Sequence, residues 1–443
     1  MNKYFYGIFL ICFTALFVSC EPEVPPLSPP TPPPPSPVTY ENNQAVSKKR
    51  GIGFNAIYAA DFPVLADGVS WAYNWGNSGF NPAFTEDAKD AKIEYFPMCW
   101  NGVNANALRS FKQANPDCEY ILAYNEPNLT DQANMTPAQA AAKWGELKSI
   151  AQELNLKIVA PAMNYGTLAG YSDPIVWYDE FFSQPEVSID DVAALALHCY
   201  MPNAAGLKGM VERFRKYNKP IWMTEFCYDL GMNPNADQQR QMMCDVLNYF
   251  ETDPLIERYA WFMFDAPAKW GSCGLRPVGN NKGQFTDLGK IYVNFSSMDK
   301  EYHYGNNQVI PAEHYSNNNM ADDIGTTTYK QSVRLSVCSD TTGILEVNEF
   351  RSPKWLEYQI AQDSLAGNYK FVIRYASGVD SKMKIMANGK EIGEVDLPKT
   401  GGYTTWATIE TPALELGEGK QTIRFAPSEG IINMNWWRYK KES

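Results

Sequence analysis

Two glutamates stand where apolar stretches of the chain end, and their type and position suit one kind of chemistry. Glu126 lies in the segment YILAYNEPN at 120–128, and Glu225 lies in PIWMTEF at 220–226. A carboxylate at the exposed end of a buried strand is costly in a core but useful in a catalytic site. Two such groups on separate strands are what hydrolysis of a glycosidic bond requires, one as proton donor and one as nucleophile or base.

The segments around both glutamates belong to a regular alternation that runs from residue 49 to about 295. Short apolar runs alternate with polar or helical stretches, such as a helix predicted over 137–154 with Thr136 as its N-cap. The apolar runs cover 51–55, 69–75, 93–100, 119–126, 157–163, 192–200, 219–226 and 258–264. Eight strands alternating with helices predict an α/β fold, a (β/α)8 TIM barrel, for the domain at 49–300.

The order of these runs places the two glutamates at one face of the barrel. Glu126 ends the fourth run and Glu225 ends the seventh. Active sites of such barrels lie at the carboxyl ends of the strands, so the two carboxylates should converge there.

Alternation along the strands predicts which side chains accompany them. With Glu126 pointing into the barrel mouth, Tyr124 shares its face; with Glu225 pointing inward, Trp222 faces the helices. Proximity of Tyr124 and Trp100 predicts that Glu126 is the carboxyl group with the raised pKa. A structural role for His198 and a core position for Trp261 remain alternatives. The predicted lining consists of Trp71, Tyr73, Trp75, Trp100, Tyr124, His198, Tyr200 and Trp261.

These motifs together resemble glycoside hydrolase family 128. The matching segments are VSWAYNW at 69–75, FPMCW at 96–100, NEP at 125–127, HCY at 198–200 and WMTEF at 222–226. The resemblance implies a barrel that cleaves or binds β-1,3-glucans with retention of configuration, with Glu126 as acid/base and Glu225 as nucleophile. It also implies that Asn125 contacts the 2-hydroxyl of the sugar. The chain departs from the family at Cys99, Cys199 and Asn128, and no cofactor is expected for catalysis.

A second domain is predicted at 308–441, where short alternating strands replace the helices. Tyr369, Phe371, Ile373 and Tyr375 alternate on one face, and the dipeptide at 388–389 (NG) is typical of a type I′ hairpin. Repeated strands of this kind predict an all-β sandwich of the jelly-roll type.

The motifs of this domain resemble a carbohydrate-binding module of family 6. They are AEHY at 312–315, WLEY at 355–358, YASG at 375–378, TGGYTTW at 400–406 and NMNW at 433–436. The resemblance implies a glycan site with Tyr403 and Asn433 and a structural calcium ion held by Glu313. Asn435 stands where the family has a second acidic calcium ligand. A module that only supports the barrel is the alternative.

The N-terminus has the layout of an export signal. Lys3 precedes an apolar run that ends before Cys20 and is too short to span a bilayer. Residues 1–19 resemble a bacterial lipoprotein signal peptide with Cys20 as the lipidated residue, and a plain signal peptide is the alternative. The proline-rich segment 20–48 should form an extended spacer. The protein is expected to be exported and lipid-anchored to the outer membrane, at the cell surface or the periplasmic face.

Composition excludes other classes of protein. A net charge of −12 argues against nucleic acid as a partner. The cysteines after Cys20 are spaced neither as a disulfide framework nor as a zinc site. We therefore interpret the chain as a monomeric hydrolase of β-1,3-glucan. Rival interpretations are a related hydrolase of another β-glycan, such as xylan or mannan, and a β-glucan-binding lipoprotein with little or no turnover. Endo and exo action both stay open.

Overall fold

The computed structural model describes residues 44–279, 281–319, 333–362 and 366–442. Cys20, the signal at 1–19 and most of the proline-rich segment lie outside these residues, so export, lipidation and the spacer stay predictions. The predicted domain limits stay predictions as well. Within the described ranges, no helix is both long and apolar enough to cross a bilayer.

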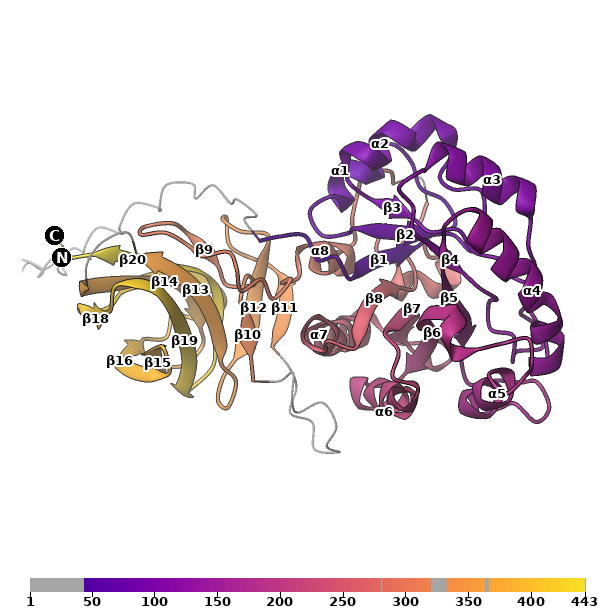
Figure 1. Cartoon of the computed structure of the whole chain (residues 1–443). Coiled ribbons are helices and arrows are strands. Elements are labelled where there is room, and N and C mark those ends of the chain that lie inside the picture. The colour runs from indigo at the N-terminus through magenta and orange to yellow at the C-terminus, as the bar shows by residue number, and fades with distance from the viewer. Residues whose placement is uncertain (1–43, 280, 320–332, 363–365, 443) are drawn as a thin grey trace, which may run out of the picture. The chain divides into compact units, whose positions relative to one another are not determined.

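Eight parallel strands form the sheet of the first domain, in the order β3-β2-β1-β8-β7-β6-β5-β4 (Figure 1). The sheet closes where the chain after β3 meets β4, through a bridge between Met98 and Leu122 and hydrogen bonds on both sides of it. The predicted barrel and its eight strands are thus confirmed. The strands are β1 (Arg50–Gly53), β2 (Trp71–Tyr73), β3 (Glu94–Tyr95), β4 (Tyr120–Leu122), β5 (Lys157–Met163), β6 (Val192–Met201), β7 (Ile221–Tyr228) and β8 (Ile256–Trp261).

Helices follow the strands and enclose the barrel (Figure 1). The predicted helix start at Pro137 is confirmed, because Thr136 and Gln139 form a reciprocal capping box there. The α-helices are α1 (Asp61–Leu65), α2 (Thr85–Asp90), α3 (Ala105–Ala114), α4 (Pro137–Glu153), α5 (Pro174–Phe181), α6 (Ala204–Phe214), α7 (Ala236–Thr252) and α8 (Asp287–Asn294). Short 3-10 helices are η1 (Pro82–Phe84), η2 (Ile189–Asp191), η3 (Arg215–Tyr217), η4 (Leu230–Met232) and η5 (Ala268–Cys273).

Aromatic rings fill the interior of the barrel. The ring of Trp222 lies 5.5 Å from that of Trp71 and 5.3 Å from that of Phe96. Because β2 and β7 are not neighbours in the sheet, the contact between Trp71 and Trp222 must cross the interior. Gly51 makes room for this packing, since a Cβ atom there would lie 2.3 Å from the Trp71 ring. The prediction that Trp222 faces the helices is therefore wrong.

The second domain consists of two antiparallel sheets, with orders β10-β13-β19-β15-β16 and β11-β12-β20-β14-β17. In addition, β18 pairs with β14, and β9 pairs with β20. The strands are β9 (Ile310–Pro311), β10 (Asn317–Asn318), β11 (Arg334–Val337), β12 (Leu345–Phe350), β13 (Leu356–Gln362), β14 (Gly367–Ser377), β15 (Ser381–Ala387), β16 (Lys390–Leu397), β17 (Gly402–Glu410), β18 (Leu414–Leu416), β19 (Gly419–Glu429) and β20 (Ile432–Lys441).

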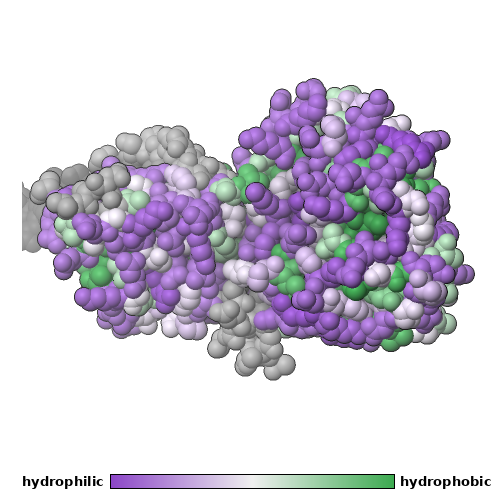
Figure 2. All heavy atoms as spheres, viewed as in Figure 1, coloured by the Kyte–Doolittle hydropathy of each residue, from purple (hydrophilic) through white to green (hydrophobic). Residues whose placement is uncertain are grey.

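An aromatic core lies between these two sheets. The ring of Phe425 on β19 lies 4.8 Å from that of Trp437 on β20, which also stacks on Phe371 of β14. The predicted hairpin is confirmed, because Asn388 and Gly389 between β15 and β16 both have positive φ. The all-β sandwich is thus confirmed, while jelly-roll connectivity stays a prediction. Figure 2 shows a mainly hydrophilic surface on the viewed face of both domains, as expected when most aromatic rings are buried.

One buried ion pair ties the start of β1 to α7. The Arg50 side chain is 1% exposed, and its Nη2 donates to Glu251 Oε1 at 2.7 Å. The Arg50 guanidinium also donates to the Tyr259 hydroxyl and to backbone carbonyls after α8, including that of Ser296. A buried charge with so many fixed partners is strongly destabilising when its counter-ion is removed.

We expect Glu251→Gln to lower the free energy of unfolding by about 3–5 kcal/mol, because the Arg50 charge would stay buried without its counter-ion. Urea unfolding followed by tryptophan fluorescence measures this change. The matched control is Glu153→Gln, which breaks the exposed Arg109–Glu153 pair and should change stability by less than about 1 kcal/mol. Equal effects of the two substitutions would contradict the assignment.

Candidate active site

Glu126 lies just past β4 in an unusual backbone conformation. Its φ is 44°, in the left-handed region that residues other than glycine seldom adopt. The backbone holds it there, since Glu126 N donates to Ala162 O at 2.9 Å and Asn125 N donates to Trp100 O at 2.8 Å. The carboxyl group is thereby turned out of the regular alternation of its strand.

Glu225 lies inside β7, next to an irregularity in the pairing with β6. Leu197 pairs with Met223, and His198 pairs with Glu225, so β7 has one extra residue, Thr224. An extra residue of this kind is a β-bulge, and it reverses the side-chain alternation beyond it. Both Trp222 and Glu225 can therefore point into the barrel.

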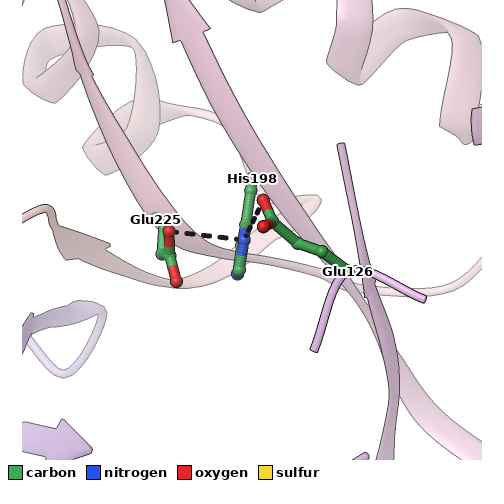
Figure 3. Close-up of side chains that lie close together, drawn as sticks. All are labelled: Glu126, His198 and Glu225. Atoms are coloured by element: carbon green, nitrogen blue, oxygen red, sulfur yellow. Dashed lines mark hydrogen bonds and ion pairs between the residues drawn. The ribbon is translucent and has the colours of Figure 1, made fainter. Parts of the chain in front are cut away.

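The structure brings the two glutamates together on either side of His198 (Figure 3). His198 Nδ1 lies 2.9 Å from Glu126 Oε1 and 3.4 Å from Glu225 Oε2. One oxygen of each carboxyl group and one imidazole nitrogen all lie within 4.8 Å of one another. All three side chains are buried. The expected convergence of the two strand ends is what the geometry shows.

Three donors surround the Glu225 carboxyl group. Trp75 Nε1 donates to its Oε1 at 2.7 Å, and the Tyr73 hydroxyl lies 3.3 Å from the same oxygen. The Tyr200 hydroxyl donates to Oε2. Like Glu126, Trp75 has a positive φ, 61°, which aims its indole at the carboxyl group. These contacts fix the orientation of Glu225.

Glu126 has fewer partners, and both use one oxygen. Its Oε1 receives the Asn164 amide Nδ2 at 3.0 Å as well as His198 Nδ1. Among the described residues, no group donates to its Oε2 within hydrogen-bond distance. Oε2 is thus the Glu126 oxygen that a substrate can engage.

The protonation of the two carboxyl groups differs from the prediction. Burial opposes ionisation of Glu126, but the His198 charge and the hydrogen bonds from His198 and Asn164 lower its pKa overall. Burial raises the pKa of Glu225, against the His198 charge and with the help of repulsion by Glu126. The prediction that Glu126 has the raised pKa is wrong for the free site, because the His198 charge and the hydrogen bonds from His198 and Asn164 outweigh the effect of burial.

Three of the predicted lining residues lie elsewhere. Trp71 is in the barrel interior, where its indole donates to Lys49 O. Tyr124 packs edge-on against Trp144 of α4, on the helix side of the sheet. Trp261 is fully buried and packs against Phe226 and, on α8, Tyr292. Alternation failed at Tyr124 because the backbone turns at Glu126.

Other predicted residues lie near the carboxyl groups, and some neighbours were missed. Trp75, Tyr73, Tyr200 and His198 contact a carboxyl group, and Trp100 and Asn125 are linked through their backbones. Asn125 is buried, and its Oδ1 has no partner among the described residues. The missed residues are Asn164, Phe262, whose ring packs on Trp75 and Tyr200, and Trp270 beside Phe262. Asn164 follows β5, Phe262 follows β8, and Trp270 lies in η5. Beyond these positions, no pattern in the sequence indicates that they lie near the carboxyl groups.

In the second domain, Tyr403 and Asn433 are neighbours. Tyr403 is 39% exposed, so its ring can face a ligand. Asn433 is buried, and its amide donates to Glu346 Oε1 and to Tyr403 O. Its Oδ1 accepts from Glu349 N. Asn433 therefore holds the backbone of Tyr403 in place. The predicted contact of Asn433 with a glycan stays a prediction.

Glu313 offers one acidic oxygen for the predicted calcium ion. It is 1% exposed, and its Oε2 has no hydrogen-bond partner among the described residues. The expected second position, Asn435, turns its amide N–H groups to Asp340 and Thr342. Calcium prefers six to eight oxygen ligands with several carboxylates, so these residues do not complete the expected set. The ion stays a prediction.

Comparison with known proteins places this site in a family. Residues 51–292, more than half of the chain, match the model of a glycosyl hydrolase catalytic core. Residues 330–439 match the model of a carbohydrate-binding module of family 35. The second domain is therefore a carbohydrate-binding module, but the predicted resemblance to family 6 is not confirmed.

Solved structures match the barrel. The endo-β-1,3-glucanase of GH128 subgroup II from Pseudomonas viridiflava is 32% identical, with a TM-score of 0.51, over 56% of this chain and 98% of its own. The corresponding enzyme from Sorangium cellulosum is 30% identical, with a TM-score of 0.50, over 55% of this chain and 97% of its own.

Curated relatives match parts of the chain. Alkali-sensitive linkage protein 1 of Schizosaccharomyces pombe is 28% identical over 56% of this chain and 45% of its own length. The clotting factor G alpha subunit of Tachypleus tridentatus is 27% identical over 25% of this chain and 16% of its own length. The chain thus spans less than half the length of these relatives.

A parallel barrel with two buried, facing carboxyl groups at one site fits the architecture of glycoside hydrolases. The chain belongs to the glycosyl hydrolase catalytic core family and, through its barrel, to glycoside hydrolase family 128.

We expect Glu313→Gln to flatten the pH dependence of stability. Burial raises the pKa of Glu313 to about 8 from an ordinary value of 4.5. The folded protein therefore holds a proton that the unfolded chain lacks. This stabilisation is complete below the ordinary value and is lost as the pH rises through about 8. Each pH unit between the two values contributes about 1.4 kcal/mol. The melting temperature of the native protein should fall between about pH 6.5 and 8.5, and that of the variant should fall less.

Titration of His314 does not contribute to the change in melting temperature over this pH range. Burial lowers its pKa to about 3 from 6.5, so its stabilisation is lost only as the pH falls below the measured window. Added calcium that raised the melting temperature of the native protein at pH 8, but not that of the variant, would support the ion. Parallel pH curves for the two proteins would contradict the assignment.

Proposed function

We propose that this protein is an exported, lipid-anchored hydrolase that cleaves β-1,3-glucan with retention of configuration. Glu225 is the nucleophile, and Glu126 is the acid/base. The family 128 enzymes from Pseudomonas and Sorangium, which are endo-β-1,3-glucanases, support the substrate class. Catalysis needs no cofactor, and the protein acts as a monomer.

The spacing of the two carboxyl groups carries this proposal. An oxygen of Glu126 and an oxygen of Glu225 lie within 4.8 Å of each other. Retaining enzymes have carboxyl groups about 5–5.5 Å apart, whereas inverting enzymes leave about 6.5–9.5 Å for a water molecule. The short spacing supports direct attack by Glu225 on the anomeric carbon.

The donors around Glu225 suit a nucleophile. Trp75 and the two tyrosines Tyr73 and Tyr200 direct N–H and O–H groups at its oxygens, and these favour the ionised form. They also hold the carboxylate in one orientation, which lowers the entropic cost of attack. Glu126, with Oε2 available, donates its proton to the glycosidic oxygen and then takes a proton from the water that releases the sugar.

The acid role requires the proton to lie on Glu126 when a glycan is bound. His198 Nδ1 contacts both carboxyl groups, so a proton has a short path between Glu225 and Glu126. Protonation of Glu126 also removes the negative charge that raises the pKa of Glu225. One proton shared by the pair is therefore enough, as expected for coupled carboxyl groups.

The second domain and the N-terminal segment bring the barrel to its substrate. The module binds β-glucan through the exposed ring of Tyr403, whose backbone oxygen accepts a hydrogen bond from Asn433. Lipidation at Cys20 anchors the protein to the outer membrane, at the cell surface or the periplasmic face, and the proline-rich segment separates the domains from the lipid.

We expect the native protein to release oligosaccharides from laminarin, with the β-anomer as the first product by proton NMR. Glu225→Gln should lower kcat by at least about 10³-fold while laminarin binding persists, because the nucleophile is lost but the shape of the site is kept. The control is Glu119→Gln, an exposed residue of the same strand region as Glu126. It should leave the rate unchanged.

Products from xylan or mannan but not from laminarin would contradict the substrate. Laminarin binding without any product would contradict the enzymatic proposal and favour a binding lipoprotein. Product profiles over time separate endo from exo action, since endo cleavage shortens the chains before small sugars accumulate.

We expect Trp75→Phe and Tyr200→Phe each to lower kcat by about 10-fold to 100-fold, because each removes one hydrogen bond to the ionised Glu225. Steady-state kinetics on laminarin measure the change. The control is Trp261→Phe, which alters a buried ring away from both carboxyl groups. It should lower the free energy of unfolding but leave kcat close to the native value. A control that lost as much kcat would contradict the role of the donors.

A further inference from the structure

The loop after β5 delivers a polar side chain to Glu126. Asn164 directly follows β5, and its Nδ2 donates to Glu126 Oε1 at 3.0 Å. Its Oδ1 accepts from Tyr165 N at 2.8 Å. The carboxylate needs a donor and the backbone N–H needs an acceptor, so both contacts require the same orientation of the amide. Asn164 therefore presents an N–H group, and not its oxygen, to Glu126.

Asn128 fixes the loop that carries Asn164. Asn128 is fully buried and lies two residues after Glu126. Its Nδ2 donates to Asn164 O at 2.7 Å, and its own backbone oxygen accepts from Thr167 N and Leu168 N. The chain segment that carries Glu126 thus also sets the position of Asn164. Relative motion of the two side chains is restricted by these three bonds.

The two donors to Glu126 differ in how they respond to pH. Asn164 does not titrate, whereas His198 can gain or lose a proton. The titratable groups around Glu126 are His198 and Tyr200 on β6, Glu225 on β7 and Tyr73 on β2. The hydrogen bond from Asn164 to Glu126 is therefore present at every pH, whereas the charges of the titratable groups around Glu126 change with pH.

The choice of oxygen has a chemical consequence. Oε1 already accepts two N–H groups, from Asn164 and His198, so a proton there would replace a hydrogen bond that the site supplies. A proton on Oε2 displaces no partner among the described residues. The pair of donors thus directs the acidic proton to the oxygen that faces the substrate.

We propose that Asn164 is a positioning residue that confines the acidic proton of Glu126 to Oε2 and sets the pH at which that proton is exchanged. This inference rests on the proposed acid/base role of Glu126. Asn164 need not touch the substrate, because it acts through the carboxyl group that it holds.

The test compares Asn164→Ala and Asn164→Asp with the native protein. Loss of a donor to the ionised form raises the pKa of Glu126, so the protonated acid persists to higher pH. On laminarin, the limb at which kcat/KM falls with rising pH should move up by about one pH unit in Asn164→Ala. It should move further in Asn164→Asp, which keeps the shape and adds a negative charge. In both variants kcat should fall more than KM changes.

A second readout does not need activity. The carboxyl carbon of Glu126, assigned as the 13C signal lost in Glu126→Gln, should titrate about one unit higher in Asn164→Ala than in the native protein. A native protein that does not cleave laminarin would contradict the proposed function, while this titration would still test Asn164. An unchanged midpoint would overturn the inference even if laminarin is cleaved.

The control is Thr167→Val, which removes the contact between Thr167 Oγ1 and Thr130 N in the same loop and leaves Asn164 in place. Its pH profile and its Glu126 midpoint should match those of the native protein. If Thr167→Val shifted them as much as Asn164→Ala does, the effect would belong to the loop and the inference would be wrong. Asn164→Asp preserves the Oδ1 contact with Tyr165 N, so it keeps the test valid if the alanine variant is unstable.

Discussion

Burial of two carboxyl groups beside one imidazole is the constraint on which the rest of the site depends. Their polar atoms lie within 4.8 Å of one another, where like charges repel and burial penalises each of them. The two carboxyl groups and the imidazole are stable together only if they share protons and if fixed hydrogen-bond donors compensate the remaining negative charge. Trp75, Tyr73 and Tyr200 do this for Glu225, and Asn164 does it for Glu126. Two of these donors lie on strands, β2 and β6, and the other two lie in the segments that follow β2 and β5, so the site needs the closed barrel to assemble.

Backbone strain accompanies these contacts. Glu126 and Trp75 both have positive φ, a conformation that costs residues other than glycine about 1–3 kcal/mol. Each persists because surrounding bonds leave no alternative: the Glu126 amide is held by Ala162 O, and the Trp75 indole by Glu225. The strain turns each side chain toward the other strands. It is therefore part of how the charges and their donors meet.

Much of the barrel could be predicted from the sequence, because apolar runs separated by helical segments report directly on which residues are buried. The convergence of Glu126 and Glu225 followed from counting those runs. Side-chain directions were harder, since alternation assumes an unbroken strand. The bulge at Thr224 turned Trp222 inward, and the left-handed turn at Glu126 left Tyr124 facing α4. No local pattern marks Asn164, because its partner lies 38 positions away along the chain.

The strands of the barrel differ in how many residue pairs join them, and the two carboxyl groups lie at pairings of different length. Glu225 stands in the β6–β7 pairing, which joins seven residue pairs. Glu126 follows β4, which pairs with β5 at three residue pairs and meets the chain after β3 at the bridge between Met98 and Leu122 and a few hydrogen bonds around it. One carboxyl group thus lies within a long strand pairing, and the other follows a short one. In the proposed reaction, the attacking carboxylate is therefore held by the longer strand pairing, and the acid/base follows the shorter one.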